Sequence, residues 1–161
     1  MYIKSILNRL IYFGRYYKIK IFAPLFVCGE SYAIGHHLHV SRKNKVKLGK
    51  NVYIGNHCHF GADINIGNNV LIASYVSVVG GDHKIDFIEG LIIDSGREIF
   101  KTIQIEDNVW IGHGAIIIHG VRVHAGAVIA AGSVVTKNVA ANSIVGGNPA
   151  KLLRMRKGVD L

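Results

Sequence analysis

Cysteine, proline and tryptophan are scarce in this chain. Its 161 residues contain 2 cysteines, 2 prolines and 1 tryptophan. Cys28 and Cys58 are too few and too far apart in the sequence for a disulfide framework or a zinc site, which favours a reducing cytosol. No linker rich in proline, glycine or serine interrupts the chain, so one domain is expected.

Acidic residues are outnumbered by basic ones. The chain has 10 Asp and Glu against 19 Lys and Arg, and its net charge is +9. Such an excess is typical either of nucleic-acid binding or of binding a phosphate-bearing small molecule. No recognition-helix pattern, zinc-finger spacing or motif of stacking aromatics is present, so no nucleic-acid partner is predicted.

Long apolar runs are missing too. Basic residues interrupt the apolar ones throughout residues 1–30, which argues against a signal peptide and a membrane-spanning helix: Lys4, Arg9, Arg15, Lys18 and Lys20. Between them, several apolar residues share one helical face: Ile3, Ile6, Leu7, Leu10, Ile11 and Phe13. The segment 1–33 is therefore predicted to form a helical cap. The alternative is a basic amphipathic segment that rests on a membrane surface, which would make the protein peripheral to the membrane.

What the chain does have is a period of six. Large apolar residues recur at this spacing in two series: Leu48, Ile54, Phe60, Ile66, Ile72 and Val78, then Ile105, Ile111, Ile117, Val123, Ile129 and Val135. The next residue is usually Gly or another small one, and the fifth is again apolar or small. Neither a helix, with a period of about 3.6, nor an alternating strand produces this pattern. The chain therefore repeats a supersecondary unit.

Six residues form a short strand and a corner, and three such units close a triangular coil of about 18 residues. Coils stack about 4.8 Å apart with strand-like hydrogen bonds. The large apolar residue points inward, and the small residue after it lets the corner turn. The pattern predicts an all-β solenoid, a parallel β-helix of about five coils over residues 34–140. The alternative is a β-sandwich or ordinary parallel sheet with evenly spaced strands, which so many in-phase residues disfavour.

A solenoid has two open ends that need covers. Pro149 is placed to begin a short helix with Asn148 as its N-cap, and Leu152 and Leu153 would pack on the last coil. Residues 141–161 are therefore predicted to form a C-terminal cap helix and tail.

The repeat breaks once. The interval from Val78 to Ile105 is four repeats of six plus three more positions, so a segment of about 84–102 must leave the prism as a loop. His83 is the last residue before this loop and occupies an outward position. A break in an otherwise regular sequence is where function is expected.

Three motifs in the C-terminal half carry a family resemblance. They are Val109-Trp110-Ile111-Gly112-His113-Gly114, the pair Thr136-Lys137 and the closing Gly147-Asn148-Pro149-Ala150-Lys151. Together they resemble the hexapeptide-repeat acyltransferases, in the branch of galactoside, maltose and polysaccharide O-acetyltransferases, over residues 45–156. The resemblance implies a left-handed parallel β-helix, an exception to the right-handed crossover rule. It also implies a homotrimer that binds acetyl-CoA between subunits.

The resemblance further implies a set of acetyl-CoA contacts at His113, Ala131, Thr136, Lys137, Lys151 and Arg154. The spacing supports this independently. Ala131 follows His113 by three repeats of six, so it should stack on His113 one coil later, and Lys137 should stack on His119 in the same way. A row of small outward residues suits the pantetheine arm. The basic side chains suit the phosphates.

The general base that the resemblance implies is His83. A neutral imidazole can accept the proton of a sugar hydroxyl as it attacks the thioester, so no acyl-enzyme is needed, and Cys58 is predicted to be a core residue. Two residues are candidates to orient the imidazole. Asn65 lies three repeats of six earlier and should sit one coil below His83, and Asp86 could fold back from the loop.

The other histidines raise a metal alternative. Carbonic anhydrases of the same fold bind zinc through three histidines, two of them five residues apart, as His119 and His124 are here. The phase break destroys the two-coil register between His83 and His119, so no catalytic metal is predicted. His36, His37 and His39 are expected to decorate the first coil, and His57 and His59 could line the acceptor pocket.

The sequence therefore predicts a cytoplasmic, acetyl-CoA-dependent O-acetyltransferase. Its acceptor would be a small-molecule or lipid-linked sugar in the assembly of lipopolysaccharide, capsule or another surface polysaccharide. An amino-sugar N-acetyltransferase, a zinc trimer of the carbonic anhydrase type and an inactive structural trimer are the alternatives. The loop 84–102 and the N-terminal segment are expected to select the acceptor.

Overall fold

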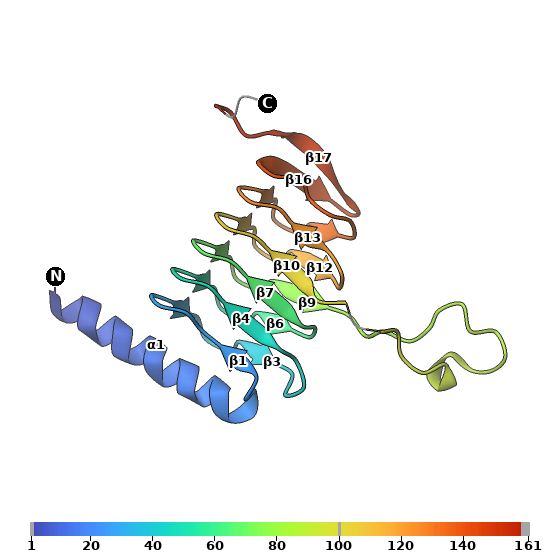
Figure 1. Cartoon of the computed structure of the whole chain (residues 1–161), viewed down its shortest axis with the longest axis horizontal. Helices are drawn as coiled ribbons and strands as arrows, with labels where there is room; N and C mark the ends of the chain where they lie inside the picture. The colour runs from blue at the N-terminus through green and yellow to red at the C-terminus, as the bar shows by residue number, and fades with distance from the viewer. Residues whose placement is uncertain (1, 100, 159–161) are drawn as a thin grey trace.

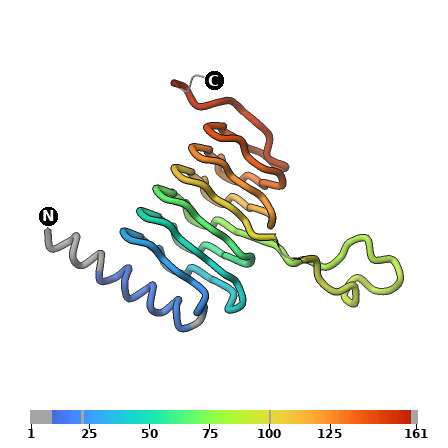
Figure 2. Tube along the Cα trace, in the orientation of Figure 1, coloured from blue at the N-terminus to red at the C-terminus, as the bar shows by residue number. Residues whose placement is uncertain are grey.

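The chain folds as a triangular solenoid (Figures 1 and 2). Its structure is a computed structural model that describes residues 2–99 and 101–158, without the side chains of residues 2–9 and 22. Strands from successive coils pair in parallel along each face. The predicted parallel β-helix is therefore confirmed.

Three faces form the prism. Face A contains β1 (Phe26–Val27), β4 (Val46–Leu48), β7 (Ile64–Ile66), β10 (Ile103–Ile105) and β13 (Arg122–Val123). Face B contains β2 (Ala33–Ile34), β5 (Tyr53–Ile54), β8 (Leu71–Ile72), β11 (Trp110–Ile111), β14 (Val128–Ile129), β16 (Ser143–Gly147) and β17 (Ala150–Met155). Face C contains β3 (His39–Val40), β6 (His59–Phe60), β9 (Ser77–Val79), β12 (Ile116–Ile118) and β15 (Val134–Val135).

Successive coils stack in register, three repeats of six apart. On face B, Tyr53 pairs with Leu71, and Trp110 pairs with Val128. Leu71 is itself opposite Trp110, which follows it by much more than one coil, so an extra segment is inserted between these two coils. The stacked strands begin at Phe26, earlier than the predicted residue 34, and face B has two strands more than the other faces.

The interior is filled by the two predicted series. None of their twelve residues is more than 6% exposed, and together with the fifth residues of the repeat they form one continuous cluster. Cys58 belongs to this cluster, as predicted, and its thiol lies 3.3 Å from the carbonyl oxygen of Ala73. A narrow interior of this kind is what places an aliphatic residue at every sixth position.

The corners need small residues for a different reason from the predicted one. A Cβ atom on Gly55 would lie 2.5 Å from the backbone nitrogen of Ser74, and one on Gly112 would lie 2.6 Å from that of Ala131. Glycine at the second position therefore lets successive corners touch. The left-handed backbone occurs two residues later, for example at His57 (φ 56°).

The helix α1 (Tyr2–Phe22) covers the first coil, as predicted. Tyr16 and Ile19 pack against the core, and Arg15 Nη1 donates a 2.8 Å hydrogen bond to the carbonyl oxygen of Ile34. The amino-terminal part of the helix extends past the prism (Figure 1). The predicted face includes Ile3, Ile6 and Leu7, whose side chains lie outside the described part. Over the stretches that the structure describes, no helix has the length and hydropathy to cross a membrane.

A β-hairpin closes the other end, so the predicted C-terminal helix was wrong. β16 continues face B in parallel, and β17 returns antiparallel to it, with Gly147 opposite Ala150. A returning strand pairs the backbone groups that β16 would otherwise leave as an open edge, which a helix cannot do. Leu152 and Leu153, expected to pack on the last coil, are 61% and 62% exposed.

The inserted residues form an arm that projects from the prism between β9 and β10, as the phase break predicts (Figures 1 and 2). The arm contains one 3-10 turn, η1 (Ile92–Asp94). Its aliphatic side chains are largely exposed, up to 90% for Ile88: Ile85, Ile88, Leu91, Ile92, Ile93 and Ile99. The arm therefore carries an apolar surface that the single chain does not cover.

Candidate active site

The predicted site residues lie mainly at two corners of the prism. We name a corner by the faces that it joins, so corner BC leads from face B to face C and corner CA from face C to face A. His113 and Ala131 lie at corner BC, whereas Thr136 and Lys137 lie at corner CA. His83 is also at corner CA, where the arm begins.

Two antiparallel segments hold His83 at the base of the arm. His83 pairs with Arg97 as the arm returns to the prism, and the backbone N–H of Glu98 donates a 2.8 Å hydrogen bond to the carbonyl oxygen of Asp82. Arg97 Nη1 also donates to the carbonyl oxygen of Gly81, at 2.9 Å. The half-buried imidazole is therefore attached to a braced segment rather than to a free loop.

Ser95 is the side chain that contacts the imidazole of His83. Nδ1 of His83 lies 3.3 Å from Oγ of Ser95, and Ser95 is only 6% exposed. The Ser95 hydroxyl donates its own hydrogen to the carbonyl oxygen of Gly96, at 3.2 Å. When the hydroxyl donates to Gly96, its oxygen can only accept from Nδ1–H, because a hydroxyl has a single proton. The neutral imidazole then has Nε2 as its unprotonated nitrogen, which is the form that a general base requires.

Neither of the two candidates from the sequence orients His83. Asn65 pairs with Gln104, and its Nδ2 donates to Gln104 Oε1 at 3.3 Å. The prediction that Asn65 sits one coil below His83 was wrong because the arm removes His83 from the stack and β10 supplies the next strand. Asp86 is exposed further along the arm, and the side chain that contacts the imidazole is Ser95. Sequence reasoning missed Ser95 because the period of six does not describe how the arm pairs with itself.

Corner BC is open on its upper coils. The backbone N–H of Gly132 donates a 2.8 Å hydrogen bond to the carbonyl oxygen of His113, so Ala131 follows His113 one coil later, as predicted. Both residues are exposed. Gly114 and Gly132, which continue this row, have no atom within 4 Å of the position that a Cβ would occupy. The row can therefore accept an extended chain lying along it.

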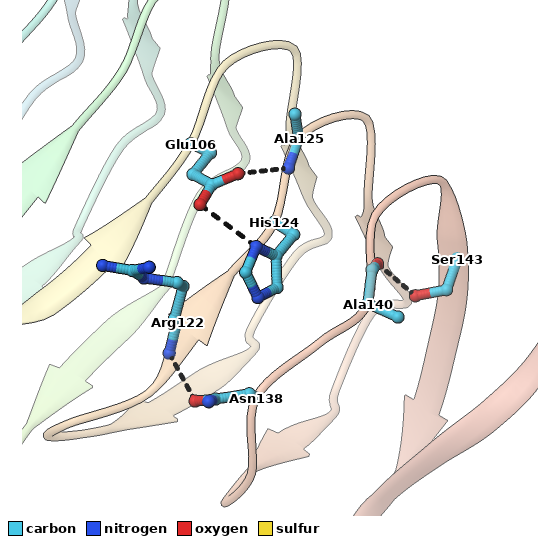
Figure 3. Close-up of polar contacts among 7 residues, drawn as sticks. All are labelled: Glu106, Arg122, His124, Ala125, Asn138, Ala140 and Ser143. Carbon is cyan, nitrogen blue, oxygen red and sulfur yellow. Dashed lines mark hydrogen bonds and ion pairs between the residues drawn. The ribbon is translucent and has the colours of Figure 1, made fainter.

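At corner CA, Thr136 and Lys137 follow β15 directly and are exposed. The next residue, Asn138, accepts a 2.8 Å hydrogen bond on Oδ1 from the backbone N–H of Arg122 (Figure 3). This contact joins the corner to the strand of the coil below. It fixes the backbone that presents the Lys137 ammonium group.

The remaining predicted cofactor residues lie on β17 and not on a helix. Lys151 is opposite Gly146, and Arg154 is opposite Ile144. Arg154 lines a cleft of about 400 Å³, together with Trp110, Arg156 and Lys157. Trp110 is 53% exposed. The sequence marked this tryptophan only as part of the family motif, so its place beside three basic side chains was not predicted.

A column of rings runs up corner BC from the first coil. His37 stacks on His57 with centroids 4.7 Å apart, and His57 stacks on Tyr75 at 5.0 Å. His113 continues the column at 5.2 Å from Tyr75. The column joins the N-terminal coil to the open row above it.

A second histidine pair lies on face C, where the rings of His39 and His59 are 5.3 Å apart. The His59 ring lies close to Gly61. Burial lowers the pKa of His59, and the neighbouring His39 lowers this pKa further.

The two histidines with the zinc spacing have other contacts. His124 Nδ1 lies 3.1 Å from Glu106, whose second oxygen accepts a 3.0 Å hydrogen bond from the backbone N–H of Ala125 (Figure 3). His119 Nδ1 accepts from the backbone N–H of Lys101 at 3.4 Å. Within the described ranges, no group of three His, Cys, Asp or Glu residues could hold a metal ion.

Comparisons with known proteins agree with this architecture. Residues 45–80 and 102–137 match the family described as bacterial transferase hexapeptide (six repeats). A hexapeptide-repeat acetyltransferase of Vibrio cholerae, solved in complex with acetyl-coenzyme A, superimposes with a TM-score of 0.72 and 32% identity, over 82% of this chain and 72% of that one.

Two curated relatives show the same likeness. A Dictyostelium discoideum protein, provisionally named an acetyltransferase, is 41% identical over 128 residues, which are 74% of this chain and 66% of that protein. The galactoside O-acetyltransferase of Lactococcus lactis is 33% identical over 114 residues, 66% of this chain and 54% of that one. The chain thus spans about half to two thirds of the length of the curated relatives that it matches.

We predict that acid destabilises the fold partly through His59. Its pKa is lower in the folded chain than the unfolded value of about 6.5, so the unfolded chain binds protons more readily. Stability is therefore full above about pH 6.5 and falls as the pH drops towards the folded pKa. His59→Gln should make the melting temperature depend less on pH between about pH 7 and pH 5. His39→Gln, which removes the smaller cause, should reduce this dependence less, and an unchanged slope in His59→Gln would contradict the assignment.

Proposed function

Because the chain belongs to the hexapeptide-repeat acetyltransferase family, we propose that it transfers the acetyl group of acetyl-CoA to a sugar hydroxyl. The acceptor is a small-molecule or lipid-linked sugar in the assembly of lipopolysaccharide, capsule or another surface polysaccharide. The observation that carries the proposal is the 3.3 Å contact of His83 Nδ1 with Ser95 at the base of the arm, an arrangement in which Ser95 can accept from Nδ1–H and Nε2 can act as the base. The name of the Lactococcus lactis relative supports a sugar hydroxyl as the acceptor.

In the proposed reaction, His83 Nε2 removes the proton of the hydroxyl as its oxygen bonds to the carbonyl carbon of the thioester. The bond between carbon and sulfur then breaks, and the imidazolium returns the proton to the departing thiolate. Ser95 acts as a positioning residue because it holds Nδ1–H throughout. Cys58 does not supply a nucleophile, since burial raises the pKa of its thiol.

The donor is proposed to lie along the prism. His113 and Ala131 border the path of the pantetheine arm, which the open row at corner BC supports. Thr136 and Lys137 lie at corner CA, as His83 does, and contact the phosphates and the nucleotide from the subunit that supplies His83. Lys151 and Arg154 contact them from the subunit that supplies the row. The cleft beside Trp110 offers an exposed ring and three cations for that end of the molecule.

The proposed assembly is a homotrimer with its active sites between subunits. Within one chain, face C separates His83 from the row of His113 and Ala131, because the strands of that face run from corner BC to corner CA. A neighbouring chain can bring its own corner BC next to His83. The exposed aliphatic residues of the arm supply an apolar surface for that contact.

We propose a cytoplasmic location, with the N-terminal helix touching the inner face of the membrane. Helix α1 contains no acidic residue, and Leu10, Phe13, Tyr17 and Ile21 are 53% to 74% exposed on the side away from the prism. An amphipathic helix of this kind binds the interface of an anionic bilayer. Cosedimentation with anionic vesicles tests this contact.

His83→Ala should lower turnover on a sugar acceptor by about 10²–10⁴-fold, the usual effect of losing a general base. The side chain is outside the hydrophobic core, so the melting temperature and the affinity for acetyl-CoA should change little. Ser95→Ala should lower turnover less, because it frees the imidazole to adopt the unproductive tautomer but does not remove it. Steady-state kinetics measure both variants. Full turnover in His83→Ala would show that another group is the base.

Lys137→Glu should weaken acetyl-CoA binding by about 10- to 100-fold, because it replaces a charge-assisted donor to phosphate by a repelling carboxylate. Calorimetry with CoA measures the change, and the Michaelis constant for the acceptor should stay the same. Lys43→Glu makes the same charge change in the exposed loop before β4 and should leave CoA affinity as it is. Equal affinities in the two variants would mean that CoA lies elsewhere.

A further inference from the structure

A basic cleft lies between helix α1 and the first coil. Its volume is about 290 Å³, near the lower end of the range for ligand pockets. Arg15 and Lys18 line it from the helix, and His36 and His37 line it from corner BC. None of its lining residues is acidic. The cleft therefore gathers positive charge and hydrogen-bond donors with no carboxylate of its own to neutralise them.

The donors of the cleft are held in place. Arg15 Nη1 donates to the carbonyl oxygen of Ile34 at 2.8 Å, and Nη2 donates to Nε2 of His36 at 2.6 Å. A guanidinium group has five N–H donors, so others stay available to a ligand. The backbone N–H of His36 donates to Asn56 Oδ1 at 2.7 Å, which fixes the segment that carries the imidazole.

The second imidazole is fixed by stacking. The rings of His37 and His57 are nearly parallel, with an angle of 15° between their planes. His37 has φ 57°, a left-handed backbone that presents its side chain at the corner. A site of preformed donors loses little side-chain entropy when it binds an anion.

The cleft opens at the foot of the ring column that leads to His113. From His37 the column passes His57 and Tyr75 to His113, three coil steps or about 14 Å at a strand spacing of ~4.8 Å. In the proposed function, His113 borders the acetyl donor. An acceptor whose anionic group occupies the cleft can therefore extend along the flat faces of the rings towards the reacting group.

We infer that this cleft binds the phosphate or diphosphate group of the sugar acceptor. A planar guanidinium fork and neighbouring imidazoles match the several oxygens of a diphosphate better than they match a single carboxylate. Two kinds of activated sugar carry this group, nucleotide-linked sugars and lipid-linked sugars, and the shared chemistry is the diphosphate ester. This inference rests on the proposed function and names the class of its acceptor.

Calorimetry with inorganic pyrophosphate tests the cleft without depending on activity. Lys18→Gln should weaken pyrophosphate binding by about tenfold, the loss of one hydrogen bond between charged groups. Arg15→Lys keeps the charge but removes the fork, and it should also weaken binding. Lys43→Gln removes one positive charge from an exposed residue that does not line the cleft and should bind like the wild type. Equal binding by Lys18→Gln and Lys43→Gln would overturn the inference.

Kinetics then identify the source of the diphosphate. One experiment uses a nucleoside diphosphate sugar in solution. The other uses a polyprenyl diphosphate sugar in phosphatidylcholine vesicles. Lys18→Gln should raise the Michaelis constant for the true acceptor about tenfold, with unchanged turnover and an unchanged constant for acetyl-CoA. For an unphosphorylated sugar, Lys18→Gln and the wild type should have the same Michaelis constant.

The outcomes separate the two proposals. Pyrophosphate binding that depends on Lys18, without acetyl transfer to any sugar, would support the cleft and contradict the proposed function. Acetyl transfer that does not depend on Lys18 would support the proposed function and contradict the inference about the cleft. Loss of binding to phosphatidylglycerol vesicles in Lys18→Gln, with pyrophosphate binding intact, would assign the cations to the membrane surface and overturn the inference.

Discussion

The backbone hydrogen bonds that hold each coil in register with the next are the constraint on which the rest of this structure depends. Most of the strands are only two or three residues long, too short to be stable alone, so each requires a partner above and below. The register puts the same kind of side chain at the same place in every coil. It therefore demands an aliphatic residue inside and glycine or another small residue where two corners touch, as at Gly55 and Gly112.

A stack of coils with so strict a register offers few positions for catalytic or binding side chains. Functional side chains can stand on outward positions, on corners, or on a segment that leaves the stack. His83 uses the last of these, because its pairing with Arg97 and its contact with Ser95 need two antiparallel segments that no coil provides. The arm interrupts the sequence period but not the stacking, because Leu71 still lies opposite Trp110 and Ser77 opposite Ile116. The chain can therefore place a braced imidazole beside regular corners that carry small or basic residues.

The period of six predicted the solenoid, its core and the position of the arm, because these follow from the stacking constraint alone. The spacing of His113 and Ala131 was predictable for the same reason. The partner of His83 was not, since Asn65 obeys the register and His83 does not. The C-terminal hairpin was missed because Pro149 and two leucines also fit the start of a helix. The need to pair the edge of β16 decides against it, and this need is visible only once face B exists.

The central claim is that each active site combines His83 at corner CA of one subunit with the open row at corner BC of another. Co-expression of two inactive variants tests it directly. His83→Ala lacks the base, and Ala131→Arg blocks the row where the structure leaves an exposed alanine. If the site is shared, mixed trimers should recover about a quarter of wild-type activity, because random assembly pairs two intact corners at one interface in four. If mixed trimers stay as inactive as either parent, both corners serve one chain and the claim is wrong.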